Sequence, residues 1–109
     1  MEGTQFMSVR VYITYKLKPE TTMDEYYQFS REIDQPLASA APGVLNYEIF
    51  EVKGAGKGSP DFTIIEDIEC ESWEAWLKVN DMPEVRPAYE GFIRLADPDS
   101  VRVHWAEKV

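Results

Sequence analysis

Residues 9–17 alternate strictly between apolar and polar side chains. The apolar face of this segment carries Val9, Val11, Ile13, Tyr15 and Leu17. A period of two residues is typical of a β-strand with one buried face. Further strands are predicted at residues 44–52, 62–69 and 101–106, and the glycine-rich loop at residues 53–60 joins the middle two as a hairpin.

Two helical regions lie between these strands. Thr22 followed by Glu25 is the pattern of a capping box, which starts a helix by satisfying free backbone N–H groups. Mostly apolar residues then recur at helical spacing and form one face of the helix: Met23, Tyr26, Ser30, Ile33 and Leu37. Pro36 is expected to weaken or bend this helix, because it lacks an N–H and its ring crowds the preceding turn, and the helix should be over by Pro42 and Gly43. The second region starts after Ser72 and is broken by the prolines within residues 83–87.

This order of elements predicts an α+β, ferredoxin-like βαββαβ fold, with a four-stranded antiparallel sheet and helices on one face. We expect residues 8–109 to form a single domain and residues 1–7 to be an N-terminal leader. The other face of the sheet carries Tyr12, Thr14 and Ile65, and is too apolar to be left to water alone. We therefore expect two sheets to pack face to face in a symmetric homodimer.

The chain has 20 acidic and 11 basic residues and a net charge of −9, which argues against a nucleic-acid partner. It has no run of 18 apolar residues, so no membrane partner is expected. Cys70 is the single cysteine, which predicts a reducing, cytoplasmic location. With one cysteine and one histidine, His104, a closed Cys/His zinc site is excluded. The glycines of residues 54–58 lack phosphate-loop spacing. Neither a metal nor an organic cofactor is expected.

The segment from Ser30 to Pro36 is the first candidate for a functional site. It places Arg31 and Asp34 three residues apart, where helical neighbours can reach each other, with Tyr27 on the same side. In one interpretation the two form an exposed ion pair worth a few tenths of a kcal/mol. In the other they line a pocket, and Asp34 is ionised and held by Arg31 or another cation, because an unpartnered buried carboxylate is costly.

Acid/base chemistry has two further candidates. His104 is the only histidine, the side chain that titrates near neutral pH, but a lone histidine on a strand is often structural. Glu66 and Asp67 are adjacent and therefore point to opposite faces of a strand. Only one of them can face the covered side, and the pattern leaves open which; we take Asp67 as the candidate. Aromatic side chains from the helical regions could line a flat cavity or simply fill the core; they include Tyr27, Trp73, Trp76 and Phe92.

Several short motifs also resemble a known family. The segment Arg-Glu-Ile-Asp-Gln-Pro at residues 31–36 is similar to Arg-Glu-Thr-Asp-Tyr-Pro of the RedY-like, HapK-type group within the dimeric α+β barrel superfamily. The likeness continues at residues 42–48, which include Tyr47, and at residues 60–62, 82–84 and 92–98. The sequence departs from the group's pattern at Ile33, Gln35 and Ile64.

The resemblance implies a role in making pyrrole- or indole-derived pigments or alkaloids, such as prodigiosin-type or bisindole compounds. It also places Arg31 and Asp34 near the pocket. Taken together with the residue patterns above, the expected catalytic residues of a cofactor-free enzyme acting on a planar aromatic intermediate are Asp34, His104 and Asp67. The expected substrate-binding residues are Arg31, Tyr27, Tyr47, Trp73, Trp76 and Phe92. Two alternatives stay open: a cofactor-independent monooxygenase of the same superfamily, and a protein that binds an unstable intermediate without chemistry.

Overall fold

The computed structural model describes residues 7–109. The predicted leader therefore lies outside the described residues, apart from Met7. In chain order the elements are β1 (Val9–Tyr15), α1 (Met23–Phe29), a π-helical turn (Ser30–Asp34), α2 (Gln35–Ser39), β2 (Val44–Glu51), β3 (Ile64–Cys70), α3 (Trp73–Val79), a 3-10 turn (Pro83–Val85), α4 (Arg86–Leu95), a 3-10 turn (Pro98–Ser100) and β4 (Arg102–Ala106). No helix among these residues is both long and apolar enough to cross a membrane.

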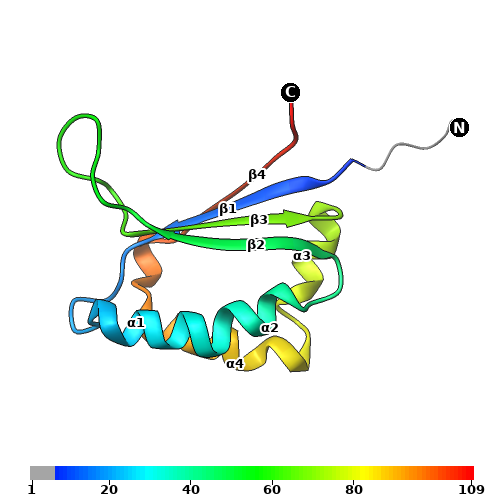
Figure 1. Ribbon diagram of the computed structural model, residues 1–109, viewed down its shortest axis with the longest axis horizontal. Helices are drawn as coiled ribbons and strands as arrows, with labels where there is room; N and C mark the ends of the chain where they lie inside the picture. Colours follow the sequence, from blue (N-terminus) through cyan, green and yellow to red (C-terminus); the bar gives the residue numbers. More distant parts are fainter. Residues whose placement is uncertain (1–6) are drawn as a thin grey trace, which may run out of the picture.

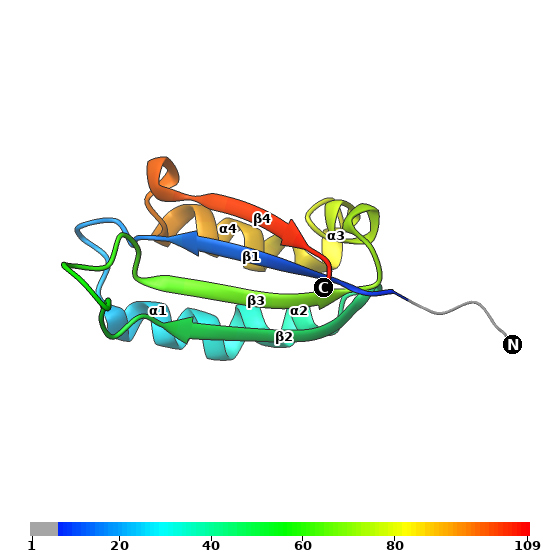
Figure 2. The same cartoon turned by 90° about the horizontal axis from the view of Figure 1, so that it is seen from above.

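The four strands form one antiparallel sheet in the order β2-β3-β1-β4, as Figure 2 shows from above. All helices lie against one face of this sheet, and the other face is uncovered (Figure 1). The predicted α+β, ferredoxin-like fold is confirmed. The loop between β2 and β3 extends beyond the end of the sheet (Figure 1).

Alternation along the strands decides which side chains enter the core. In β1 the residues from Val9 to Tyr15 alternate between buried and more exposed positions, and the buried ones face the helices. The same alternation in β3 buries Ile64, Glu66 and Ile68. Glu66 is the exception in chemistry, because it is a carboxyl group on the apolar face of the central strands. Glu66 therefore places a titratable group inside the mostly apolar core.

The first helical region begins as predicted and is over before Pro42, as predicted. The Thr22 side chain accepts a hydrogen bond from the Glu25 N–H, and the Glu25 side chain accepts one from the Thr22 N–H. The helix does not end at Pro36 but runs to Ser39. A π-helical turn precedes the proline, so Pro36 falls in the first turn of α2, where proline is tolerated.

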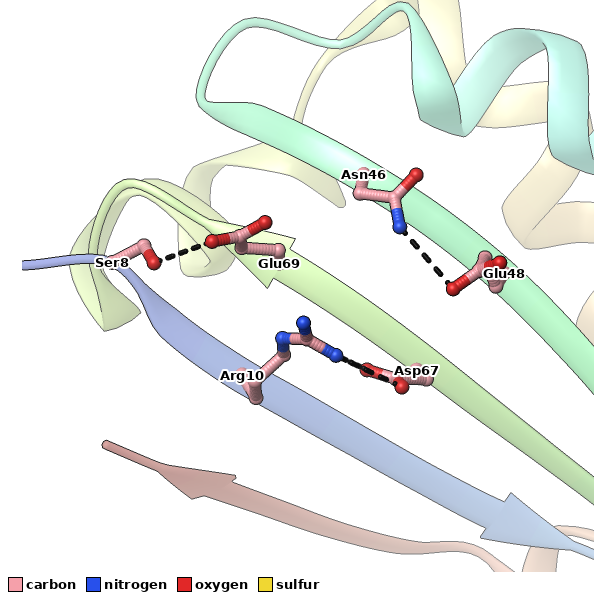
Figure 3. A network of polar contacts seen from close by, with 6 residues as sticks. All are labelled: Ser8, Arg10, Asn46, Glu48, Asp67 and Glu69. Atoms are coloured by element: carbon pink, nitrogen blue, oxygen red, sulfur yellow. Dashed lines mark hydrogen bonds and ion pairs between the residues drawn. The ribbon is translucent and has the colours of Figure 1, made fainter. Parts of the chain in front are cut away.

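The uncovered face of the sheet is more polar than predicted. Arg10 pairs with Asp67 at 3.0 Å, and the Ser8 hydroxyl donates to Glu69 at 2.6 Å (Figure 3). Large apolar side chains lie among these polar groups: Phe50 is 49% exposed and Tyr12 is 36% exposed. This face is called the open face below.

Candidate active site

Asp34 enters the space between helices and sheet because of the π-helical turn. In this turn the N–H of Gln35 donates to the carbonyl of Ser30, five residues back instead of four. Such a turn inserts an extra residue into a helix and frequently occurs at functional sites. Here both Ser30 and Asp34 are buried, with 3% and 7% of their surfaces exposed. The irregular turn thus directs two polar side chains of one helix toward the sheet.

Two residues on the helix-covered face of the sheet, Tyr47 of β2 and Glu66 of β3, lie close to Asp34. Glu66 lies on β3 opposite Ile49 of β2, and Tyr47 is two residues from Ile49, so Tyr47 and Glu66 are diagonal neighbours on one face. The Tyr47 hydroxyl lies 3.0 Å from Asp34 Oδ2 and 3.1 Å from Glu66 Oε1. One phenol therefore bridges two buried carboxyl groups.

The hydrogen-bonded network extends beyond this bridge. The Tyr15 hydroxyl donates to Glu66 Oε2 at 2.5 Å, and the hydroxyls of Tyr15 and Tyr26 are 2.6 Å apart. Tyr15 comes from β1 and Tyr26 from α1, so four separate elements and the π turn contribute one residue each. No buried side-chain nitrogen or oxygen among residues 7–109 lacks a partner. Complete pairing of this kind holds the network in one arrangement.

Burial changes the proton affinity of the two acids. Desolvation raises the pKa of Asp34 to about 6, and the hydrogen bond from Tyr47 opposes this only in part. Desolvation also raises the pKa of Glu66 to about 8, and the nearby charge of Asp34 adds to the increase. Both carboxyl groups therefore bind a proton more tightly than free carboxyl groups do, and we expect the pair to hold one proton at neutral pH, on the more deeply buried Glu66. Two carboxyl groups with separated pKa values can act as base and acid at the same pH.

A cavity of about 130 Å³ opens onto this pair. Its lining is mostly apolar and comes from the sheet, the first helix and the helices α3 and α4: Ile13, Asp34, Ala38, Tyr47, Glu66, Trp76, Val79, Asn80, Val85, Ala88, Tyr89, Phe92, Val101 and Val103. No Lys, Arg or His belongs to this lining. A dry cavity of about 150 Å³ holds a benzene ring, so this one has room for roughly one aromatic ring. The exposed residues Asn80, Tyr89 and Val103 place its mouth at the surface.

Comparison with known proteins identifies the family. Residues 9–109 match the family described as REDY-like protein HapK. The chain belongs to this family. Among curated protein sequences, none matches it significantly.

Solved structures similar to this REDY-like chain agree on the fold. HapK from Hahella chejuensis superimposes with a TM-score of 0.73 at 14% identity over 92% of both chains. A hydroxynitrile lyase from Passiflora edulis superimposes with a TM-score of 0.75 at 15% identity over 96% of both chains. SnoaB, a cofactor-independent oxygenase from Streptomyces nogalater, superimposes with a TM-score of 0.71 at 12% identity over 94% of both chains. Identities this low support the shared fold alone.

Asp67 does not reach the cavity of this REDY-like chain. It lies opposite Tyr12 and Glu48 in the sheet and is therefore on the open face, where it accepts two hydrogen bonds from Arg10 at 3.0 Å (Figure 3). The expectation that Asp67 acts together with Asp34 is wrong. Because adjacent strand residues point to opposite faces, Glu66 is the acid on the covered side.

His104 is also separated from the cavity. It pairs with Tyr12 in the register of β1 and β4, which places it on the open face, and its side chain is exposed. The sheet lies between His104 and Asp34, so the two cannot share a proton directly. The expected grouping of His104 with Asp34 is therefore not present within this chain.

Arg31 does not hold Asp34. Its guanidinium carbon lies 4.7 Å above the ring centre of Tyr27, and the only ion pairs found within residues 7–109 join other side chains. Tyr27 donates to Glu51. Arg31 and Tyr27 line a second hollow, of about 190 Å³, and not the first cavity. The proposed cation partner of Asp34 is replaced by a phenol, Tyr47.

The other expected ligand-binding residues divide into two groups. Tyr47, Trp76 and Phe92 line the cavity, and their role in binding a substrate stays a prediction. Trp73 does not; its ring stacks on that of Trp105 with centroids 5.7 Å apart and planes at 10°. Trp73 therefore supports the edge of the sheet at β4 and is outside the candidate site.

Sequence reasoning weighed Glu66 but chose Asp67, and it did not consider Tyr15 and Tyr26 as members of the site. The signal for Glu66 was present, since it shares the apolar face of residues 62–69 with Ile64 and Ile68. The tyrosines carry no such signal, because a tyrosine on an apolar face is equally typical of a core. Within residues 7–109, no group of three or more His, Cys, Asp or Glu is arranged to hold a metal ion.

Proposed function

We propose that the protein is a small enzyme of natural-product biosynthesis that moves protons on a planar aromatic intermediate by acid/base chemistry, without a cofactor. The observation that carries this proposal is the pair Asp34 and Glu66, bridged by Tyr47 at the polar end of an apolar cavity. Asp34 acts as the base and Glu66, through Tyr47, as the source of a returning proton. Positioned acid/base groups of this kind typically contribute 10²–10⁴-fold to a rate.

The lining of the cavity also indicates the class of substrate. Two acids without a cation in the lining disfavour a carboxylate or phosphate on the bound group, because like charges repel at low dielectric. Asp34 can instead accept a hydrogen bond from an N–H or O–H group of the ligand. A pyrrole fulfils both conditions, and so does an indole whose second ring extends through the mouth of the cavity. Both are consistent with the pyrrole- or indole-derived products expected for this family.

A probe reaction tests the proposal without the natural substrate. Oxindole is flat and neutral and carries an N–H, and its C3–H bond is acidified by the adjacent carbonyl. Asp34 would take the C3 proton, the C–H electron pair would move toward the carbonyl oxygen as an enolate, and a solvent-derived proton would return to C3. We expect the protein to bind oxindole labelled with deuterium at C3 and to accelerate loss of the label to water, followed by NMR.

The same assay separates the alternatives. A protein that only binds an intermediate would bind oxindole and leave the rate of deuterium loss at that of buffer. An oxygenase, the activity stated for SnoaB, would start with the same proton removal but would also consume O₂. Absence of both binding and exchange would contradict the proposed function.

We propose further that two chains associate through their open faces, in the cytoplasm. One structural relative from Bacteroides fragilis is described as dimeric, and Phe50 and Tyr12 expose apolar surface on this face. Burying such side chains against a second sheet is favourable, while Arg10 and Asp67 can stay paired. Sedimentation at micromolar concentration should show a dimer; a stable monomer would contradict this.

A further inference from the structure

The hydrogen-bonded network around Glu66 leads away from the cavity and reaches a second hollow. From Glu66 it passes to Tyr15 at 2.5 Å and from Tyr15 to Tyr26 at 2.6 Å. Tyr26 lines the second hollow, and Glu66 lines the first cavity. The network therefore connects two separate spaces on either side of the buried pair.

The hydrogens along this network can be assigned from the donors available. A protonated Glu66 donates through Oε1 to the Tyr47 oxygen, and Tyr47 donates to the Asp34 carboxylate. On the other side Tyr15 donates to Glu66 Oε2. Because the single Tyr15 proton is thereby engaged, Tyr26 must be the donor in its contact with Tyr15. All the hydrogen bonds then point the same way, from Tyr26 to Asp34.

The far end of the network is close to water. Gln35 Nε2 donates to Ser30 Oγ at 3.0 Å. Both residues line the second hollow, together with the exposed side chain of Arg31. Hydroxyls at this end can therefore exchange protons with solvent, whereas Glu66 is buried within the sheet.

We propose that Tyr15 and Tyr26 form a proton relay that connects Asp34, through Glu66 and Tyr47, with water in the second hollow. The inference rests on the proposed role of Asp34 as a base. An aromatic ring in the first cavity displaces water from Asp34, so a proton taken from the ring needs another route out. The tyrosine and carboxyl oxygens supply it.

The transfer balances without any other reactant. When Asp34 takes a proton, the O–H groups first turn so that the hydrogen bonds run from Asp34 to Tyr26, with the Glu66 proton on Oε2 facing Tyr15. Asp34 then passes its proton to the Tyr47 oxygen, Tyr47 passes its own to Glu66 Oε1, Glu66 passes its Oε2 proton to Tyr15, and Tyr15 and Tyr26 pass theirs on to a water molecule. Each of the four residues after Asp34 gains one proton and loses one, so no phenolate accumulates. Burial raises the pKa of each of these phenols and keeps them neutral between transfers.

Aromatic neighbours hold the two tyrosines of the relay in place. The Tyr15 ring makes an edge contact with Phe92 at 4.9 Å between centroids, and Tyr26 makes one with Phe29 at 6.3 Å. Helices α3 and α4 contribute no charged side chain to the cavity beside Glu66 and Asp34. These two carboxyl groups are therefore the only ionised or readily ionised groups facing the relay from within the cavity lining.

Exchange of the network's hydroxyl protons with water tests the relay directly. These protons, strongly deshielded in short hydrogen bonds, are followed by proton NMR with saturation transfer from water. The first cavity is closed in two ways, by saturating oxindole or by an Ala88→Leu side chain. With the cavity closed, exchange should continue in the otherwise unchanged protein and slow at least tenfold in Tyr26→Phe.

The control is Tyr12→Phe, which removes a hydroxyl from the same strand as Tyr15 but on the open face; its exchange should match that of the parent. If Tyr26→Phe does not fold, Tyr15→Phe interrupts the relay one step earlier and should show the same slowing. Equal exchange in Tyr26→Phe and parent, or loss of exchange in the parent once the cavity is closed, would overturn the relay. The Ala88→Leu arm gives this result even if oxindole is neither bound nor turned over, so the two proposals fail separately.

Discussion

Replacing Asp34 with asparagine should slow loss of deuterium from oxindole at least about a hundredfold, while the affinity for oxindole changes little. The asparagine oxygen can still accept the hydrogen bond of Tyr47, so the shape of the site is kept. What is lost is the base, since an amide does not take a proton at neutral pH. Removal of a positioned base typically costs 10²–10⁴-fold in rate.

Asp67→Asn is the matched control for this experiment. It neutralises a carboxylate on the same strand as Glu66, but on the open face and paired with Arg10. Turnover should stay within about twofold of the parent, because Asp67 does not line the cavity. If Asp34→Asn exchanged the label as fast as Asp67→Asn, Asp34 would be a structural residue and the proposed function would be wrong.

The second large effect concerns stability against pH. The folded chain binds protons at Asp34 and Glu66 more tightly than the unfolded chain, because their pKa values rise from 3.8 to about 6 and from 4.5 to about 8. Their contribution to the free energy of unfolding is therefore complete below about pH 4 and is lost as the pH rises toward 8. One pKa unit corresponds to about 1.4 kcal/mol, so shifts of this size put the loss at several kcal/mol.

Glu66→Gln should remove most of this dependence. The amide imitates a protonated carboxyl group, since its nitrogen can donate to Tyr47 and its oxygen can accept from Tyr15. Between pH 5 and pH 8.5 the melting temperature of Glu66→Gln should rise relative to that of the parent by at least about 10 °C, taking about 4–8 °C per kcal/mol for a domain of this size. Asp67→Asn should keep the parent's slope. If the melting temperatures of Glu66→Gln and the parent changed with pH in the same way, Glu66 would not be buried as a protonated acid.

The fold was predictable because its signals are local and periodic. Alternation in the strands, the Thr22–Glu25 capping box and the helix-breaking prolines each act over a few residues, and their order corresponds to one known topology. Asp34 could be proposed for the same reason, since it falls on the margin of the inward-facing stripe of a well-defined helix. The π-helical turn that buries it has no comparable sequence signal. It depends on tertiary packing and on Pro36 following the turn.

The partners of Asp34 were not predictable in the same way. Arg31 is close in sequence and suggested an ion pair, but the helix directs its side chain to a different hollow from Asp34. Tyr47 and Glu66 lie 13 and 32 residues from Asp34 and meet it only through the register of β2 and β3. Choosing Asp67 over Glu66 placed the second acid on the wrong face, an error of one residue in a structure with a period of two.

The central claim is that Asp34 and Glu66 share one proton at neutral pH, with the proton on Glu66. Carboxyl carbon NMR of protein labelled at Asp and Glu side chains measures this directly, with Asp34→Asn and Glu66→Gln to assign the two signals. The account predicts that near pH 7 Glu66 gives the shift of a protonated acid and Asp34 that of a carboxylate, and that Glu66 loses its proton only near pH 8. Both groups titrating near pH 4 and fully ionised at pH 7 would contradict it.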